Sequence, residues 1–287
     1  MAPAAIATMP TMNRIDVLFG RLREQGRHAL MPFVTAGDPD LATTGLLIRE
    51  MVRRGADMIE LGIPYSDPVA DGPVIAASYQ RALERGVKVA HILDAVRAIR
   101  AEGREELDAT PIVSMSSFAI IHRVGVERYL DDAAAAGLDG LIVPDLPVEE
   151  SAALMEKATA RALKLIQLIT PTTPKARAEE IARMTTGFIY FVSVAGITGE
   201  RKELPPDLVA NVEWLRARTE LPICVGFGIS TPDHVRRLAP VADGLIVGSA
   251  LVRRLADAAD RPRPEVVRDI GDFVGELAGA MKPGEAG

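Results

Sequence analysis

Eight short apolar runs recur along the chain from residue 29 onward, and longer stretches with helical period separate them. Residues 46–55 and 126–137 show this period, with apolar positions at i, i+3 and i+4 and a closing glycine. Such alternation is typical of βαβ units that build a parallel sheet. Eight strands with interposed helices favour a closed (β/α)8 barrel, the TIM barrel, over an open sheet. The runs cover residues 29–34, 57–63, 111–115, 140–145, 164–170, 187–192, 222–227 and 244–249.

The same pattern indicates a single domain. The 287 residues are enough for two small domains, but one α/β barrel commonly takes about 250 residues. No linker rich in glycine or serine interrupts the alternation. We therefore expect one α/β barrel over residues 13–282, with an extra N-terminal helix, a disordered extension at 1–12 and a loose tail at 283–287.

Charge and composition exclude several classes of protein. Apolar residues make up 48% of the chain, which is enough for a buried core. The net charge is −6 and no basic stripe appears, so we expect no nucleic-acid binding. The apolar stretches are shorter than the roughly 20 residues of a membrane span, and the first residues lack the basic flank of a signal peptide. Cys224 is the only cysteine, so a cytoplasmic protein without a disulfide framework is expected.

The stretch ELGIPYSDPVADGP, residues 60–73, follows the second apolar run and carries two notable acids. Glu60 lies near the carboxyl end of the predicted strand, where barrel enzymes place their active sites. Apolar neighbours disfavour a charged carboxylate and raise its pKa toward the range that is useful for proton transfer at neutral pH. The structural alternatives are a buried glutamate paired with an arginine, or one that faces the helix layer.

Asp71 lies in one of two unusually long connections, residues 63–72 after the second strand and 193–206 after the sixth. Loops of this length in a compact domain are often functional lids. Prolines and glycines restrict the backbone around Asp71, so this loop can present an acid over the barrel mouth. The alternative is an ordinary Asp-Gly turn.

Three glycine-containing segments predict a phosphate site. They read AGITG at 195–199, GFGIS at 226–230, and GS at 248–249 before a helix. Glycine lets backbone N–H groups approach an anion, and the loops after strands 7 and 8 of barrels often bind phosphate. A turn glycine is the alternative at each position. The expected phosphate-binding residues are Gly196, Gly199, Gly228, Gly248 and Ser249.

The sequence lacks the residues that Schiff-base and metal-assisted aldolases need. A Schiff-base aldolase needs a lysine toward the carboxyl ends of the strands, whereas Lys164 opens the fifth predicted strand at the opposite end. The four histidines show no pair at metal-ligand spacing. We therefore expect neither metal nor cofactor, and carboxylate acid/base chemistry on a small phosphorylated molecule.

Six motifs in order carry a resemblance to a known family: PFVTAGDPD, ELGIPYSDPVADGP, IVPDLPVEES, VSVAGITG, GFGIS and GSALV. From about Leu18 to the last helices the chain resembles the tryptophan synthase alpha chain family. The resemblance implies a lyase of tryptophan biosynthesis that cleaves indole-3-glycerol phosphate, by a retro-aldol reaction without cofactor, into indole and glyceraldehyde 3-phosphate. It also implies a partner, a pyridoxal phosphate beta chain that receives indole through a tunnel, in a tetramer of two alpha and two beta chains.

The resemblance also implies roles for single residues. Glu60 matches the principal acid/base, which protonates the indole ring carbon and takes a proton from the glycerol hydroxyl. Asp71 matches the acid that accepts the indole N–H and stabilises the indolenine-like intermediate. Thr198 matches a lid threonine that closes onto the Asp71 loop and excludes water. Six residues match the family's indole pocket, although for any one of them alone ordinary barrel core is the better interpretation. They are Phe33, Met115, Ile142, Tyr190, Phe227 and Ile246.

One segment departs from the family pattern. Where the family commonly has Tyr-x-Asn after the third strand, near the partner interface, this chain has Ser117, Phe118 and Ala119. The departure bears on contact with the beta chain more than on cleavage. The favoured hypothesis is the alpha half of a synthase complex. The alternatives are a stand-alone indole-3-glycerol phosphate lyase, a weakly active regulatory subunit and, remotely, a sugar-phosphate isomerase.

Overall fold

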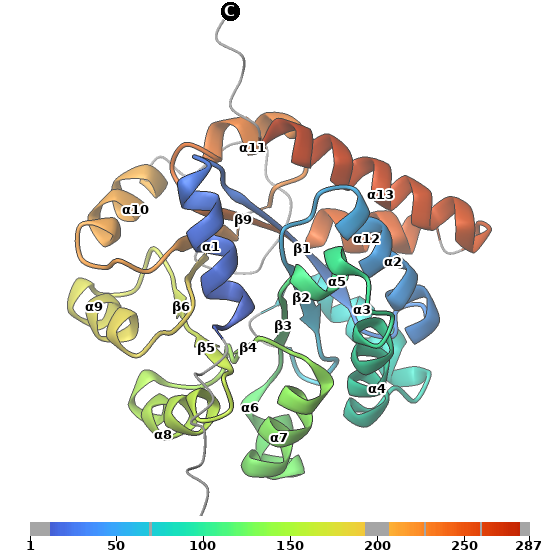
Figure 1. Ribbon diagram of the computed structural model, residues 1–287, viewed down its shortest axis with the longest axis horizontal. Helices are drawn as coiled ribbons and strands as arrows, with labels where there is room; N and C mark the ends of the chain where they lie inside the picture. Colours follow the sequence, from blue (N-terminus) through green and yellow to red (C-terminus); the bar gives the residue numbers. More distant parts are fainter. Residues whose placement is uncertain (1–11, 69–70, 193–206, 227, 259, 282–287) are drawn as a thin grey trace, which may run out of the picture.

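The computed structural model describes residues 12–68, 71–192, 207–226, 228–258 and 260–281. In this part of the chain, parallel strands form the inner layer and helices surround them (Figure 1). The predictions for the chain ends concern residues 1–12 and 283–287, which, apart from residue 12, lie outside the described residues.

The strands pair in the order β5-β4-β3-β2-β1-β9-β8-β7-β6. The two strands at the ends of this order, β5 and β6, are neighbours in the sequence and are separated only by Gln167. The carbonyl of Gln167 accepts a hydrogen bond from the backbone N–H of Tyr190 at 3.0 Å. The sheet therefore closes through the predicted fifth strand, and the (β/α)8 barrel is confirmed with that strand interrupted once. The strands are β1 Ala29–Thr35, β2 Ile59–Gly62, β3 Ile112–Met115, β4 Gly140–Ile142, β5 Lys164–Ile166, β6 Leu168–Ile169, β7 Ile189–Val192, β8 Ile223–Gly226 and β9 Gly244–Val247.

Helices follow the strands as the sequence pattern predicts. The predicted stretch at 126–137 ends at Gly137, which adopts a left-handed conformation with φ 88°. Within the described residues, none of the helices combines the length and the apolarity that a membrane-crossing segment needs. The helices are α1 Arg14–Glu24, α2 Leu41–Arg53, α3 Pro73–Glu84, α4 Val89–Arg100, α5 Glu105–Ala109, α6 Phe118–Val124, α7 Val126–Ala136, α8 Val148–Thr159, α9 Lys175–Arg183, α10 Leu208–Arg216, α11 Pro232–Leu238, α12 Ser249–Asp257 and α13 Arg263–Ala280.

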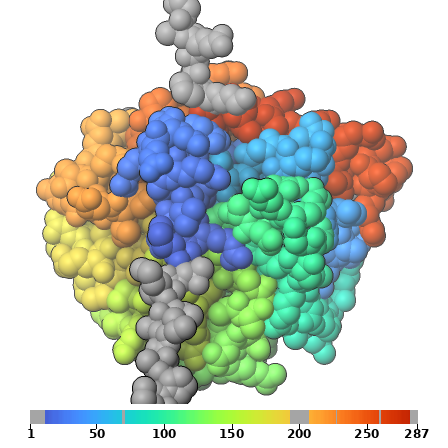
Figure 2. All heavy atoms as spheres, in the orientation of Figure 1, coloured from blue at the N-terminus to red at the C-terminus, as the bar shows by residue number. Residues whose placement is uncertain are grey.

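The expected N-terminal helix, α1, closes the amino-terminal end of the barrel. Its buried residues Ile15 and Phe19 belong to the same apolar cluster as the barrel interior. Asp139, just before β4, holds the helix in place by accepting a hydrogen bond from Arg14 at 3.0 Å. In the space-filling view, the atoms of α1 lie over the middle of this face (Figure 2). Any opening for a ligand is therefore expected at the other end, where the strands finish.

The apolar residues form two cores. One lies between the sheet and the helices and includes Ile59 and Leu61 of β2. The other fills the barrel and includes Met58, which precedes the same strand. Because successive side chains of a strand point to opposite faces, Glu60 shares the inward direction of Met58. A carboxyl group is thus placed inside the apolar barrel, close to the carboxyl end of β2.

Candidate active site

Glu60 is buried inside the barrel, with 1% of its surface exposed. It lies between Phe33 of β1 and Val113 of β3 in the strand register. Its Oε2 atom has no hydrogen-bond partner among the described residues, and no described arginine pairs with it. Burial first, and then the nearby charge of Asp71, raises the pKa of Glu60 to about 8. The arginine-paired and helix-facing alternatives are therefore wrong.

Asp71 lies just before α3, at the carboxyl end of β2. The Tyr65 hydroxyl donates a hydrogen bond to Asp71 Oδ2 at 3.2 Å, and the Asp71 N–H donates to the carbonyl of Pro68 at 3.0 Å. Gly72 has φ −76°, so the Asp-Gly pair is not a turn that needs a left-handed glycine. Burial raises the pKa of Asp71 to about 6, although the hydrogen bond from Tyr65 opposes this shift.

The two acids differ in protonation at neutral pH. With a pKa of about 8, Glu60 carries a proton at pH 7, whereas Asp71, with a pKa of about 6, is mostly ionised. Two carboxyl groups whose environments separate their pKa values are suited to different roles in one reaction. This pair can deliver a proton from Glu60 and stabilise positive charge with Asp71.

The predicted pocket residues gather on the inner face of the barrel. Phe33, Met115, Ile142 and Ile246 belong to the interior cluster, and Tyr190 packs against it. Phe227 lies outside the described residues. These side chains come from β1, β3, β4, β7 and β9, and they give the interior an apolar, partly aromatic wall.

Gly62 and Gly226 leave space for two aromatic rings of the pocket. This role was not predicted from the sequence for either glycine. A β-carbon on Gly62 would stand 2.4 Å from Cζ of Phe33, and one on Gly226 would stand 2.5 Å from Cε1 of Tyr190. Both distances are far below normal contact, so any larger residue would displace a ring. The sequence could have pointed to Gly62, because it lies two residues after Glu60 and therefore on the same face of β2.

The predicted phosphate residues lie in part within the described chain. Gly228 follows β8, and Gly248 and Ser249 follow β9, which pairs directly with β8. Ser249 is the first residue of α12, so a helix N-terminus meets two glycine-containing loops at the carboxyl end of the barrel. This arrangement suits an anion. Gly196, Thr198 and Gly199 lie outside the described residues.

Two features of the described residues bear on metal and Schiff-base chemistry. No group of three or more His, Cys, Asp or Glu residues that could hold a metal ion occurs there. Lys164 lies at the start of β5, as predicted, and its Nζ pairs with Asp16 of α1 at 2.6 Å. This lysine is therefore held at the closed end of the barrel, away from Glu60.

Two tyrosines near the acids were not predicted as site residues. Tyr65 binds Asp71 as described above, and its ring packs against the ring of Tyr79 with 5.3 Å between centroids. Tyr79 belongs to α3 and is fully buried in the interior cluster. The sequence could have pointed to Tyr65, because this residue lies in the same stretch, residues 60–73, as the two acids. For Tyr79 the sequence showed only an apolar position in a predicted helix.

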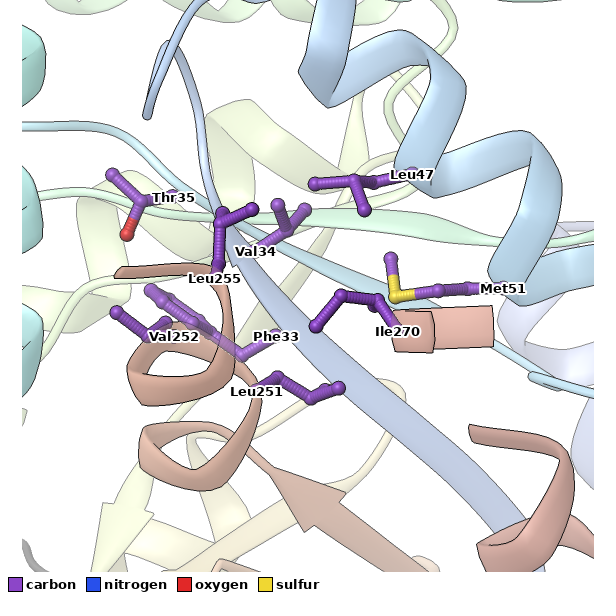
Figure 3. A pocket seen from close by; sticks show the side chains of 9 residues that line it. All are labelled: Phe33, Val34, Thr35, Leu47, Met51, Leu251, Val252, Leu255 and Ile270. Carbon is purple, nitrogen blue, oxygen red and sulfur yellow. The ribbon is translucent and has the colours of Figure 1, made fainter. Parts of the chain in front are cut away.

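A small hollow beside β1 is a packing defect rather than a ligand site. Its volume is about 10 Å³, roughly the space of one water molecule. Apolar side chains from β1, α2, α12 and α13 converge on it (Figure 3). The lining residues are Phe33, Val34, Thr35, Leu47, Met51, Leu251, Val252, Leu255 and Ile270.

Known proteins place this chain in a family. The family model of the tryptophan synthase alpha chain matches residues 19–282. The chain belongs to the tryptophan synthase alpha chain family. The alpha chain of Rhodopirellula baltica is 50% identical over 94% of this chain and 99% of its own length. That of Synechocystis is 49% identical over 94% of this chain and its entire length.

Solved alpha chain structures share the barrel. The tryptophan synthase alpha chain of Legionella pneumophila superposes with a TM-score of 0.86 at 33% identity, covering 96% of this chain and all of that one. A chain of Mycobacterium tuberculosis tryptophan synthase gives a TM-score of 0.84 at 34% identity, again over 96% of this chain and all of its own. The resemblance inferred from the six motifs is confirmed.

The segment that departs from the alpha chain pattern is well ordered by its own contacts. The hydroxyl of Ser117 donates to Asp145 Oδ2 at 2.6 Å and accepts from the Ala119 N–H at 3.1 Å, which caps α6. The backbone N–H of Phe118 donates to Asp145 Oδ1 at 2.7 Å. The ends of β3 and β4 are therefore joined without the tyrosine hydroxyl and asparagine amide common in the family.

Proposed function

We propose that Glu60 and Asp71 carry out the retro-aldol cleavage of indole-3-glycerol phosphate, with the chain acting as the alpha subunit of a tryptophan synthase. The observation that carries this proposal is the pair of buried acids with separated pKa values, about 8 for Glu60 and about 6 for Asp71. Family membership supplies the substrate. The reaction then needs only proton transfers and charge stabilisation.

Cleavage begins with protonation of the indole ring. Protonated Glu60 gives its proton to the ring carbon that carries the glycerol chain, and the positive charge passes to the ring nitrogen. Ionised Asp71 accepts a hydrogen bond from that N–H and stabilises the charge. Because the barrel interior excludes water, this electrostatic stabilisation is stronger than it would be in solution.

The second step breaks the carbon–carbon bond. Glu60, now a carboxylate in an apolar setting, takes the proton from the hydroxyl on the adjoining glycerol carbon. The oxygen forms the aldehyde carbonyl, the bonding pair returns to the ring, and the ring nitrogen becomes neutral. Glu60 ends protonated, as it began, so the cycle consumes no cofactor.

The rest of the site binds and shields the substrate. Gly228, Gly248 and Ser249 are proposed to bind its phosphate, mainly through backbone N–H groups and the N-terminus of α12. Gly196 and Gly199 are proposed to complete this site, and Thr198 to close over Asp71 as part of a lid. The apolar wall formed by Phe33, Met115, Ile142, Tyr190 and Ile246, together with Phe227, is proposed to hold the indole ring.

The partner is a pyridoxal phosphate beta chain, and the proposed compartment is the cytoplasm. The contacts of Ser117 with Asp145 rigidify the connection between β3 and β4, where the family pattern is altered. A stand-alone lyase remains the second candidate, because this departure lies where alpha chains are expected to meet their partner.

Assays with and without the partner separate these candidates. We expect the purified chain to form indole and glyceraldehyde 3-phosphate in equal amounts, slowly alone and much faster with the beta chain from the same genome. A fast rate that is unchanged by the beta chain would favour the stand-alone lyase. If neither product formed, with or without the beta chain, the proposed function would be contradicted.

A further inference from the structure

Tyr79 places a polar group inside the barrel that no structural contact explains. Its side chain is fully buried, and its hydroxyl has no hydrogen-bond partner among the described residues. Burying a hydroxyl without a partner costs free energy, whereas phenylalanine would fill the same volume without that cost. Tyr65, whose ring packs against that of Tyr79, does have a partner, because its hydroxyl donates to Asp71.

The position of the Tyr79 hydroxyl is fixed relative to Glu60. A β-carbon on Gly62 would stand 2.9 Å from this oxygen. Gly62 is two residues beyond Glu60 on β2, so the two positions face the same side of the strand. The hydroxyl of Tyr79 therefore reaches the inner face of β2, one step nearer the barrel mouth than the carboxyl of Glu60.

Two polar atoms without described partners thus lie on one stretch of the barrel wall. Oε2 of Glu60 is the first and the hydroxyl of Tyr79 is the second. Burial and the nearby Asp71 raise the pKa of Tyr79 well above its ordinary value, so its hydroxyl keeps its proton and can donate at neutral pH. The apolar neighbours in the interior cluster, including Phe33 and Ile75, offer no acceptor.

We propose that Tyr79 is a substrate-binding residue that donates a hydrogen bond to an oxygen of the polyol phosphate chain, next to Glu60. This inference rests on the proposed function and adds a residue to its site. The glycerol hydroxyl that gives its proton to Glu60 is the oxygen that best fits, because it must lie against the carboxyl of Glu60. A donor at that oxygen fixes its orientation for proton removal.

Replacing Tyr79 with phenylalanine tests the proposal. The variant keeps the ring and its packing against Tyr65 and loses only the hydroxyl. We expect kcat/KM for indole-3-glycerol phosphate to fall about tenfold, the loss typical of one hydrogen bond. The melting temperature is expected to stay the same or to rise, because an unpartnered buried hydroxyl has been removed.

Tyr129→Phe is the matched control. Tyr129 is also fully buried, but it lies on α7 in the core between sheet and helices. This control is expected to keep the kinetics of the unmodified chain. Normal kcat/KM in Tyr79→Phe, equal losses in both variants, or a loss that merely parallels a lower melting temperature would each overturn the proposal. An inactive unmodified chain would instead refute the proposed function, and the present inference with it.

Discussion

Glu60→Gln is expected to lower the rate of indole formation by roughly 10²- to 10⁴-fold, the range of a lost general acid/base. Glutamine has the same shape but neither gives the ring carbon a proton nor takes one from the glycerol hydroxyl. Because both steps use the same carboxyl, one substitution removes both. Steady-state assays of indole release, with and without the beta chain, measure this effect, and a near-normal rate would contradict the role of Glu60.

The stability of the same variant provides an internal control. In the folded chain the pKa of Glu60 is about 8, compared with an ordinary value of 4.5. The folded state therefore binds more protons than the unfolded state between these values, so the stability contributed by protonated Glu60 is complete below about pH 4.5 and lost by about pH 8. We expect the melting temperature of Glu60→Gln to exceed that of the unmodified chain increasingly across this window. A variant that is inactive because it unfolds would show the opposite.

Asp71→Asn is expected to lower the cleavage rate by roughly 10²- to 10³-fold, as for other losses of charge stabilisation in a transition state. Asparagine still accepts the indole N–H through its amide oxygen, but it supplies no negative charge to the ring. The fold is expected to persist, because Asp71 lies in a loop and its backbone bond to Pro68 does not involve the side chain.

The pH dependence of the cleavage rate in Asp71→Asn shows whether the lost rate is due to the lost charge of Asp71. Protonation of Asp71, with a pKa of about 6, removes its charge, so cleavage by the unmodified chain is expected to fall below about pH 6. In Asp71→Asn this decline should be absent, since no charge remains to be lost. A decline at the same pH in both proteins would assign it to another group and contradict the role of Asp71.

Much of the fold could be predicted because apolar runs and helical periods depend on local sequence. The interruption at Gln167 could not, since residues 164–170 read as one continuous run and the break appears only where the sheet closes. The inward direction of Glu60 follows from alternation along β2. Its pKa of about 8 depends on burial by distant segments, which no local pattern contains.

Some residues of the site could be predicted from the sequence, and others could not. Glu60 and Asp71 belong to one distinctive stretch, so both could be named as candidates from the residues, and their separate roles followed from the family resemblance. Gly62 and Tyr79 could not be assigned, because their significance is a close approach between β2 and α3 that exists only in three dimensions. The hydrogen bond from Tyr65 to Asp71 likewise depends on the shape of the loop.

The most direct test of the central claim is the protonation state of Glu60. Carboxyl ¹³C NMR titrations of the unmodified chain and of Glu60→Gln would assign its resonance by difference. We expect a glutamate that is still protonated at pH 7 and titrates near pH 8. Titration near the ordinary glutamate value of 4.5 would mean that Glu60 is ionised at neutral pH and cannot be the proton donor.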